Sequence, residues 1–231
     1  MMRRAIAITM VALWAAIASA ATAADRIVSP SDRQTLAAVL EQASVGDRII
    51  LRPGRYPGRL VIRKTLTVHG DPGASIVGDG TGTVVTIEAP DVVLRGVDIS
   101  GSGMDLETMD SGVFATEAAT AALIEDTVVT GNLYGIYIHG AAKSLVRHNK
   151  IVGLKDGRLS EAGNGVTVWN APGAKVVHND ISFGRDGIAT NASKRNVFSG
   201  NRFANVRFAI HYMYTNDSEI SGNISTGNLV G

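Results

Sequence analysis

A repeat of 22 residues restricts the fold of this chain more than any other feature of its sequence. Asparagine recurs at intervals of 30, 22 and 22 residues, at Asn149, Asn179, Asn201 and Asn223. Small residues keep the same rhythm, with intervals of 30, 22, 22 and 22, at Gly135, Gly165, Gly187, Ala209 and Gly231. The interval of 30 is one repeat with eight inserted residues. The asparagines and the small residues thus recur with the same period, which indicates a solenoid in which each repeat is one stacked rung.

Short runs of aliphatic and β-branched residues fill each repeat and predict strands. The clearest runs share one pattern, at 92–99, 122–129, 144–151, 174–181, 196–203 and 218–224. Such strands pair in parallel with the rungs above and below, at about 4.8 Å. The sequence therefore predicts an all-β chain, a right-handed parallel β-helix of the pectate-lyase type, because crossovers between parallel strands are right-handed. The recurrent asparagines are expected to be architectural, with stacked side-chain amides and left-handed backbone at each asparagine.

The two ends of the sequence differ from the repeats. Residues 1–23 resemble a cleaved general-secretion (Sec-type) signal peptide, with Arg3 and Arg4 before an apolar run and Ala-x-Ala triplets at 18–20 and 21–23. Residues 24–58 are expected to hold a capping helix and the first strand, with a capping box at Ser31 and Gln34 and a helix end at Gly46. Residues 59–231 hold the rungs. The last rung begins at Gly231 and stops, so we expect a solenoid truncated at its C-terminus.

Charge and cysteine content exclude several functions. Removal of the signal peptide leaves 20 basic and 21 acidic side chains, a net charge of −1, because Arg3 and Arg4 leave with it. A nearly neutral surface gives no electrostatic reason to expect nucleic acid as a partner. The chain has no cysteine, so it has neither disulfides nor thiolate ligands.

Carboxylates were considered for catalysis, because many β-helix enzymes act on acidic polysaccharides. The candidates lie on a loop excursion or beside turns, at Asp71, Asp105, Asp110, Asp180 and Asp186. Since they do not line one strand face with a basic residue, we expect them to be solvated turn residues. A polysaccharide lyase or C5-epimerase remains an alternative function, and a purely structural solenoid is another.

Histidine and methionine suggest metal chemistry instead. Alternation along the strand turns Ile210 inward and His211 outward, and then Tyr212 inward and Met213 outward. Aligned rungs give two outward columns, one of Tyr137, Thr167, Ala189 and His211, the other of His139, Trp169, Asn191 and Met213. An imidazole and thioethers without a thiolate suit exchangeable Cu(I), although ordinary packing or interface roles remain open.

The remaining histidines and methionines have weaker patterns. His139 lies three rungs from Met213, about 14 Å, so the two cannot share an ion but can share a partner-binding face. Met104 and Met109 lie on the loop excursion formed by residues 101–112, where thioethers can be exposed. Three further histidines sit beside turns and are expected to be plain polar surface, at His69, His148 and His178.

The run Arg-Phe-Ala-Ile-His-Tyr-Met-Tyr-Thr-Asn-Asp at 207–217 resembles the NosD family, the periplasmic maturation factors of nitrous-oxide reductase. Segments 101–106, 109–114, 132–137, 163–170 and 184–188 agree, so the resemblance covers essentially the whole mature chain. NosD proteins continue for many more rungs, roughly doubling this chain. The sequence therefore resembles the amino-terminal part of the family.

This resemblance implies a non-enzymatic periplasmic accessory protein. It implies an adaptor on an inner-membrane ABC transporter that accepts copper from a lipoprotein chaperone and serves apo nitrous-oxide reductase while its copper centres are assembled. Transient Cu(I) is the implied metal. Carried over by position, the candidate ligands are His211 and Met213, with Met109 and Met104 as secondary candidates.

Overall fold

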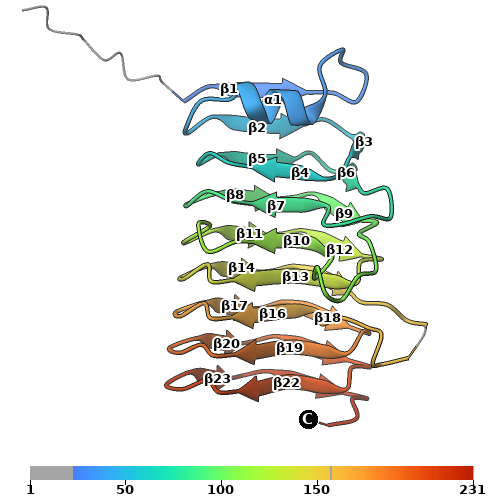
Figure 1. Ribbon diagram of the computed structural model, residues 1–231, viewed down its shortest axis with the longest axis vertical. Coiled ribbons are helices and arrows are strands. Elements are labelled where there is room, and N and C mark those ends of the chain that lie inside the picture. Colours follow the sequence, from blue (N-terminus) through green and yellow to red (C-terminus); the bar gives the residue numbers. More distant parts are fainter. Residues whose placement is uncertain (1–22, 157, 231) are drawn as a thin grey trace, which may run out of the picture.

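The computed structural model describes residues 23–156 and 158–230, which form a parallel β-helix whose rungs stack along one axis (Figure 1). The predicted signal peptide lies outside these residues except for Ala23, and Gly231 also lies outside them. No helix in the described ranges is long and apolar enough to cross a membrane.

Three parallel sheets make up the sides of the solenoid. Sheet A contains β1 (Asp25–Val28), β2 (Arg48–Leu51), β5 (Thr67–Gly70), β8 (Val93–Arg95), β11 (Leu123–Glu125), β14 (Leu145–Arg147), β17 (Lys175–Val177), β20 (Val197–Ser199) and β23 (Glu219–Ser221). Sheet B contains β3 (Gly54–Pro57), β6 (Ala74–Val77), β9 (Asp98–Ser100), β12 (Val128–Thr130), β15 (Lys150–Val152), β18 (Asp180–Ser182), β21 (Arg202–Ala204) and β24 (Ile224–Thr226). Sheet C contains β4 (Leu60–Ile62), β7 (Val85–Ile87), β10 (Ser111–Ala115), β13 (Tyr134–His139), β16 (Val166–Trp169), β19 (Asp186–Asn191) and β22 (Phe208–Met213). The parallel β-helix prediction is confirmed.

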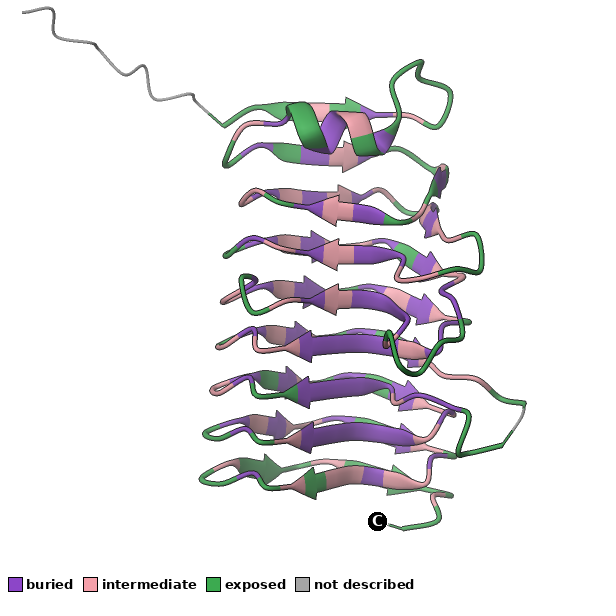
Figure 2. Cartoon of the chain, in the orientation of Figure 1, coloured by how far each residue is buried: buried purple, intermediate pink, exposed green. Residues whose placement is uncertain are grey.

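The core runs along the axis as columns of buried residues, and the strands in Figure 2 carry the purple of buried residues on rung after rung. Ile136, Val166 and Ile188 pair in register on sheet C and are 0% exposed. Ile210 continues the column in β22 and is partly buried. The glycine directly before each of the first three residues faces inward, since an added Cβ would lie 2.7 Å from the Ile151 side chain at Gly135 and 2.4 Å from that of Ile181 at Gly165. The period of the small residues therefore reflects core packing.

The amino-terminal cap differs from the predicted one. Helix α1 (Leu36–Gln42) begins after Thr35, whose hydroxyl accepts the Ala38 N–H at 3.3 Å, and it ends well before Gly46. The Ser31 capping box was wrong because this segment forms a turn, in which the Asp32 carboxylate accepts the Ser29 N–H. The apolar face of α1 is buried against the rungs, as its spacing predicted.

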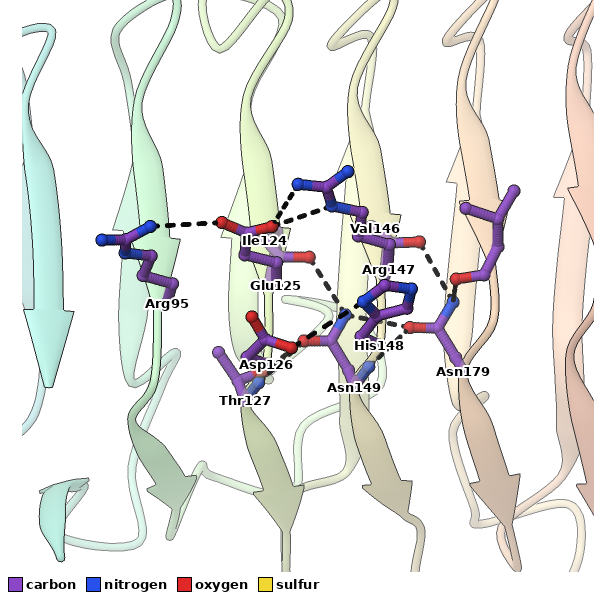
Figure 3. A network of polar contacts seen from close by, with 11 residues as sticks. Arg95, Ile124, Glu125, Asp126, Thr127, Val146, Arg147, His148, Asn149 and Asn179 are labelled. Atoms are coloured by element: carbon purple, nitrogen blue, oxygen red, sulfur yellow. Dashed lines mark hydrogen bonds and ion pairs between the residues drawn. The ribbon is translucent and has the colours of Figure 1, made fainter. Parts of the chain in front are cut away.

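The recurrent asparagines form a buried hydrogen-bond ladder between sheets A and B (Figure 3). Each side-chain amide donates to the amide oxygen of the next rung, at 2.9 Å from Asn149 to Asn179, 3.0 Å from Asn179 to Asn201 and 3.1 Å from Asn201 to Asn223. Thr127 begins the ladder by donating its hydroxyl to Asn149. The architectural role predicted for the asparagines is confirmed.

The left-handed backbone at this turn lies one residue earlier than predicted. The residue before each ladder member has positive φ, with 51° at Asp126 and 56° at both His148 and His178. Gly200 and Gly222 occupy the same position on the next two rungs. The asparagines therefore contribute their amides, and a separate residue accepts the unusual backbone conformation.

Asp47 ties the first described residues to the solenoid and makes its stability sensitive to acid. Its carboxylate is buried and accepts the N–H groups of Ala24 and Ser44 and the guanidinium of Arg26. These bonds, that of Ala24 foremost, lower the pKa of Asp47 from 3.8 to about 2. Because the folded pKa is the lower one, the stabilisation is complete above about pH 4 and is lost as the pH falls towards 2.

Asp47→Asn should therefore flatten the pH dependence of stability in this window. Urea unfolding midpoints between pH 2 and pH 6 measure the effect. Asp25→Asn, which changes an exposed carboxylate in the same region, is the matched control and should leave the slope unchanged. Equal slopes for the wild-type and Asp47→Asn proteins would contradict this role for Asp47.

Candidate functional site

The outer face of sheet C carries the two columns that the sequence predicted. Strand register aligns one column of Tyr137, Thr167, Ala189 and His211, and the other of His139, Trp169, Asn191 and Met213. The prediction of the columns is confirmed. His211 and Met213 thus project from the same side of β22, two residues apart.

His211 is held by a buried carboxylate from the preceding rung. Its Nδ1 atom lies 3.1 Å from Oδ2 of Asp186, whose side chain is 2% exposed. The ring also stacks on Phe208, with ring centroids 4.9 Å apart and planes at 23°. The imidazole is 30% exposed, so it is fixed on one side and open on the other.

Arg207 completes the neutralisation of Asp186. Its Nε donates to Oδ1 at 2.8 Å and its Nη2 to Oδ2 at 2.6 Å. Hydrogen bonding to Asp186 raises the pKa of Arg207 above its usual value, so the guanidinium stays charged. The guanidinium carbon also lies 4.7 Å from the centroid of Phe208. This bidentate pair keeps the carboxylate in position beside His211.

The contacts of Nδ1 determine which nitrogen of His211 can bind a metal. The guanidinium of Arg207 can only donate hydrogen bonds. Its Nη2 lies 3.3 Å from Nδ1 of His211 but only 2.6 Å from Oδ2 of Asp186, so its stronger hydrogen bond goes to Asp186. The arrangement favours a proton on Nδ1 donated to Asp186. Nε2 then carries the free lone pair, as in metal sites where a carboxylate orients a histidine ligand.

The local backbone around Gly187 allows this cluster to form. Asp186 pairs with Phe208 and Ile188 pairs with Ile210. Gly187 faces the core between them, and an added Cβ there would lie 2.4 Å from the ring of Phe203. Glycine thus admits the large buried ring while Asp186 turns to the outer face.

Met213 borders a shallow groove on the same face of sheet C. The groove has a volume of about 170 Å³ and is lined by Tyr134, Tyr137, Asn164, Thr167, Trp169, Ala189, Asn191 and Met213. In its column Ala189 lies between Thr167 and His211. Because its side chain is small, the surface of sheet C is recessed at that point. Trp169 is 42% exposed and provides an apolar surface in the same groove, two rungs from Met213 in its column. We call this surface, together with His211, the sheet C groove.

Packed aromatic rings hold rigid the end of this groove that is farther from His211. Tyr137 stacks on Phe114 at 5.2 Å and meets Tyr134 edge-on at 5.4 Å. Burial raises the pKa of Tyr137 to about 12, so it stays a neutral phenol. His139 stacks against the same rings. His139 and Met213 therefore lie on one outer face, three rungs apart in the same column.

Met104 and Met109 lie elsewhere. They belong to the excursion before β10, which is four strands from β22 in sheet C, about 19 Å along the axis. Met104 is 59% exposed and lies beside the inserted loop, in a hollow with Leu154 and Ala162. The structure thus does not bring the four candidate ligands together.

Sequence reasoning missed the residues that position His211. Asp110 and Asp186 were expected to be solvated, but both are buried, Asp110 by contacts within the excursion and Asp186 by Arg207 and His211. Arg207 and Phe208 gave no separate signal. Within residues 23–156 and 158–230, no three histidine, aspartate or glutamate side chains gather closely enough to hold a metal ion.

Solved structures with a similar backbone define the class of protein. Pectate lyase Pel9A has a TM-score of 0.56 and 13% identity, covering 80% of this chain and 62% of that one. A pectin methylesterase bound to a hexasaccharide has a TM-score of 0.51 and 15% identity, covering 85% and 82%. At this identity the likeness shows the fold alone. The chain is a parallel β-helix protein.

Sequence relatives narrow the class. Residues 153–231 match the family described as "Periplasmic copper-binding protein (NosD)". The probable ABC transporter binding protein NosD of Stutzerimonas stutzeri is 35% identical over 137 residues, 59% of this chain and 31% of the relative. Its namesake from Pseudomonas aeruginosa PAO1 is 30% identical over 137 residues, 59% of this chain and 32% of the relative. Part of the chain is thus similar to NosD proteins, and the match spans about a third of the length of these relatives.

Proposed function

We propose that this chain belongs to a non-enzymatic periplasmic accessory protein that assists assembly of the copper centres of nitrous-oxide reductase. The orientation of His211 by Asp186, beside the thioether of Met213, is the observation that carries the proposal. The similarity to NosD proteins supports it, since that family is described as periplasmic and copper-binding. Export by the signal peptide at residues 1–23 fits a periplasmic location.

Copper is the cargo in this proposal, and His211 and Met213 are its ligands. A neutral imidazole and a thioether are soft or borderline donors that suit Cu(I) and exchange it readily. Asp186 and Arg207 act as positioning residues, because they fix the ring and direct Nε2 outward. Met109 and Met104 are secondary candidate ligands, for a separate position on the excursion where Cu(I) binds transiently.

The sheet C groove is the proposed docking face for the partners. Exposed aromatic and methionine side chains are enriched at protein interfaces, and this face offers Trp169 and Met213 next to His211. The partners are a copper chaperone lipoprotein, apo nitrous-oxide reductase and an ABC transporter at the inner membrane. The printed name of the relatives, ABC transporter binding protein, supports the last of these.

An anaerobic Cu(I) titration of the purified mature chain tests the ligands. We expect one equivalent of Cu(I), bound in competition with a colorimetric chelator, and loss of that equivalent in His211→Ala/Met213→Ala. Met104→Ala/Met109→Ala removes the secondary candidates, which lie about 19 Å away along the axis, and serves as the control because it should retain the equivalent bound by His211 and Met213. Thermal unfolding checks that each variant is folded.

Two results would reject the ligand assignment. One is undiminished binding in His211→Ala/Met213→Ala, and the other is loss of binding only in the control variant. The wider role is tested in a full-length homologue, where the double substitution at the positions aligned with His211 and Met213 should abolish copper loading of the reductase. Normal loading by a folded variant would reject the assembly role of this face.

A further inference from the structure

One carboxylate and two imidazoles follow one another on the turn between sheets A and B, away from the sheet C groove. Asp126, His148 and His178 occupy the residue before the ladder on three successive rungs. Their φ angles agree within 5°, at 51°, 56° and 56°. Because the backbone is the same on each rung, the three side chains leave it from equivalent points about 4.8 Å apart.

The two imidazoles are neighbours in space. Their ring centroids are 5.6 Å apart and their planes are tilted by 48° (Figure 3 shows His148 on this turn beside Asp126). Both side chains are exposed, that of His148 by 52%. Neither ring makes a hydrogen bond of ordinary length within the described residues, so ligand atoms are available on both.

The rungs on either side orient the pair. Nδ1 of His148 faces the Asp126 carboxylate at 3.9 Å. The Nδ1–Cε1 edge of His178 lies over Gly200, since an added Cβ there would be 2.4 Å and 2.5 Å from those atoms. Because Gly200 has no side chain, the His178 ring can occupy the space above it. The Nε2 side of His178 therefore faces away from Gly200.

The separation of the rings suits chelation by both histidines. Histidine nitrogens bind Zn²⁺ at about 2.0–2.1 Å, which places two ring centroids on one ion about 4.5–5.5 Å apart. The observed 5.6 Å is close to that range, and exposed side chains adjust by such amounts through small rotations. Imidazole suits Zn²⁺, Cu²⁺ and Ni²⁺, and water can complete the coordination.

We propose that His148 and His178 form a two-imidazole clamp for a divalent transition-metal ion, with Asp126 as the positioning residue for His148. The clamp differs in chemistry from the His211 and Met213 pair, because it lacks a thioether and has a carboxylate behind one ligand. It also lies on another side of the solenoid. It binds divalent ions independently of any Cu(I) carried by sheet C.

Substitution by asparagine tests the clamp without breaking the turn, since asparagine tolerates the left-handed backbone at these positions. The tag-free, metal-free full chain is titrated aerobically with Cu²⁺ and followed by calorimetry and electron paramagnetic resonance. We expect one equivalent with hyperfine splitting from two nitrogens. His148→Asn and His178→Asn should each weaken binding at least tenfold and remove one nitrogen from the spectrum.

The control for the carboxylate is Asp217→Asn, an exposed aspartate with φ of 54° on a different turn. It should bind Cu²⁺ as the wild type does, whereas Asp126→Asn should bind several-fold more weakly with both nitrogens retained. Unchanged affinity and an unchanged spectrum in His148→Asn/His178→Asn would overturn the proposal. A Cu²⁺ spectrum that lacks two nitrogen ligands in the wild type would overturn it as well.

Discussion

Asp186→Ala is expected to weaken Cu(I) binding by 10- to 100-fold while also destabilising the fold by about 2–3 kcal/mol. Affinity falls because His211 loses the acceptor at 3.1 Å that holds its ring and its Nδ1 proton. Stability falls because Arg207, whose side chain is 25% exposed, loses both oxygens of a carboxylate that is itself 2% exposed. Because Arg207 is partly exposed, the expected loss lies below the roughly 3–5 kcal/mol of a fully buried broken pair.

Asp186→Asn separates the two effects. An asparagine keeps the shape and one oxygen acceptor but removes the negative charge, so we expect a smaller loss of stability than in the alanine variant. Urea unfolding and competitive Cu(I) titration measure the two quantities on the same preparations. Wild-type Cu(I) affinity in a folded Asp186→Ala protein would show that Asp186 does not position a copper ligand.

Asn201→Ala is expected to lower the free energy of unfolding by about 3 kcal/mol, the largest effect we predict for a single ladder position. The oxygen of Asn201 accepts the backbone N–H and the side-chain amide of Asn179, at 2.9 Å and 3.0 Å. Its own amide donates to the carbonyl of Val176 at 2.8 Å. The residue is 0% exposed, so alanine leaves the buried Asn179 N–H and the Val176 carbonyl of the preceding rung without this partner.

Asn216→Ala is the matched control for the ladder. Asn216 is an exposed asparagine on another turn of the same rungs, and its removal should change stability by less than about 0.5 kcal/mol. Urea unfolding followed by circular dichroism measures both variants. Equal stability of Asn201→Ala and Asn216→Ala would show that the ladder does not hold the rungs together.

The solenoid and its columns were predictable because one period governs the chain. Once the rungs are aligned at 22 residues, strand alternation places His211 and Met213 outward and Ile210 inward without further information. The same regularity predicted the ladder. It failed for the amino-terminal cap, where the sequence does not repeat and where Thr35, rather than Ser31, begins the helix.

The environment of His211 could not be predicted in the same way. Asp186 and Arg207 are 21 residues apart, one short of the repeat, and they meet because the backbone departs from regular pairing at Gly187. The periodic small residues mark where the register departs from regular pairing, but their period does not show which charged side chains meet on the outer face. The His148 and His178 pair was missed because the left-handed position was assigned to the asparagine, one residue too late.

The ladder also gives the solenoid a direction. In the ladder, Asn149, Asn179 and Asn201 each donate an N–H to the amide oxygen of the C-terminal rung and accept from the amino-terminal rung, so these bonds all point one way along the axis. The amide nitrogens also donate to backbone carbonyls of the preceding rung. A rung face on the C-terminal side therefore presents N–H donors at this position, and the opposite face presents oxygen acceptors. Two C-terminal faces brought together would set donor against donor. Any strand that stacks on this face must arrive in the same orientation as the rungs before it, so the asparagine column selects head-to-tail stacking and opposes mirror-image pairing of two solenoids.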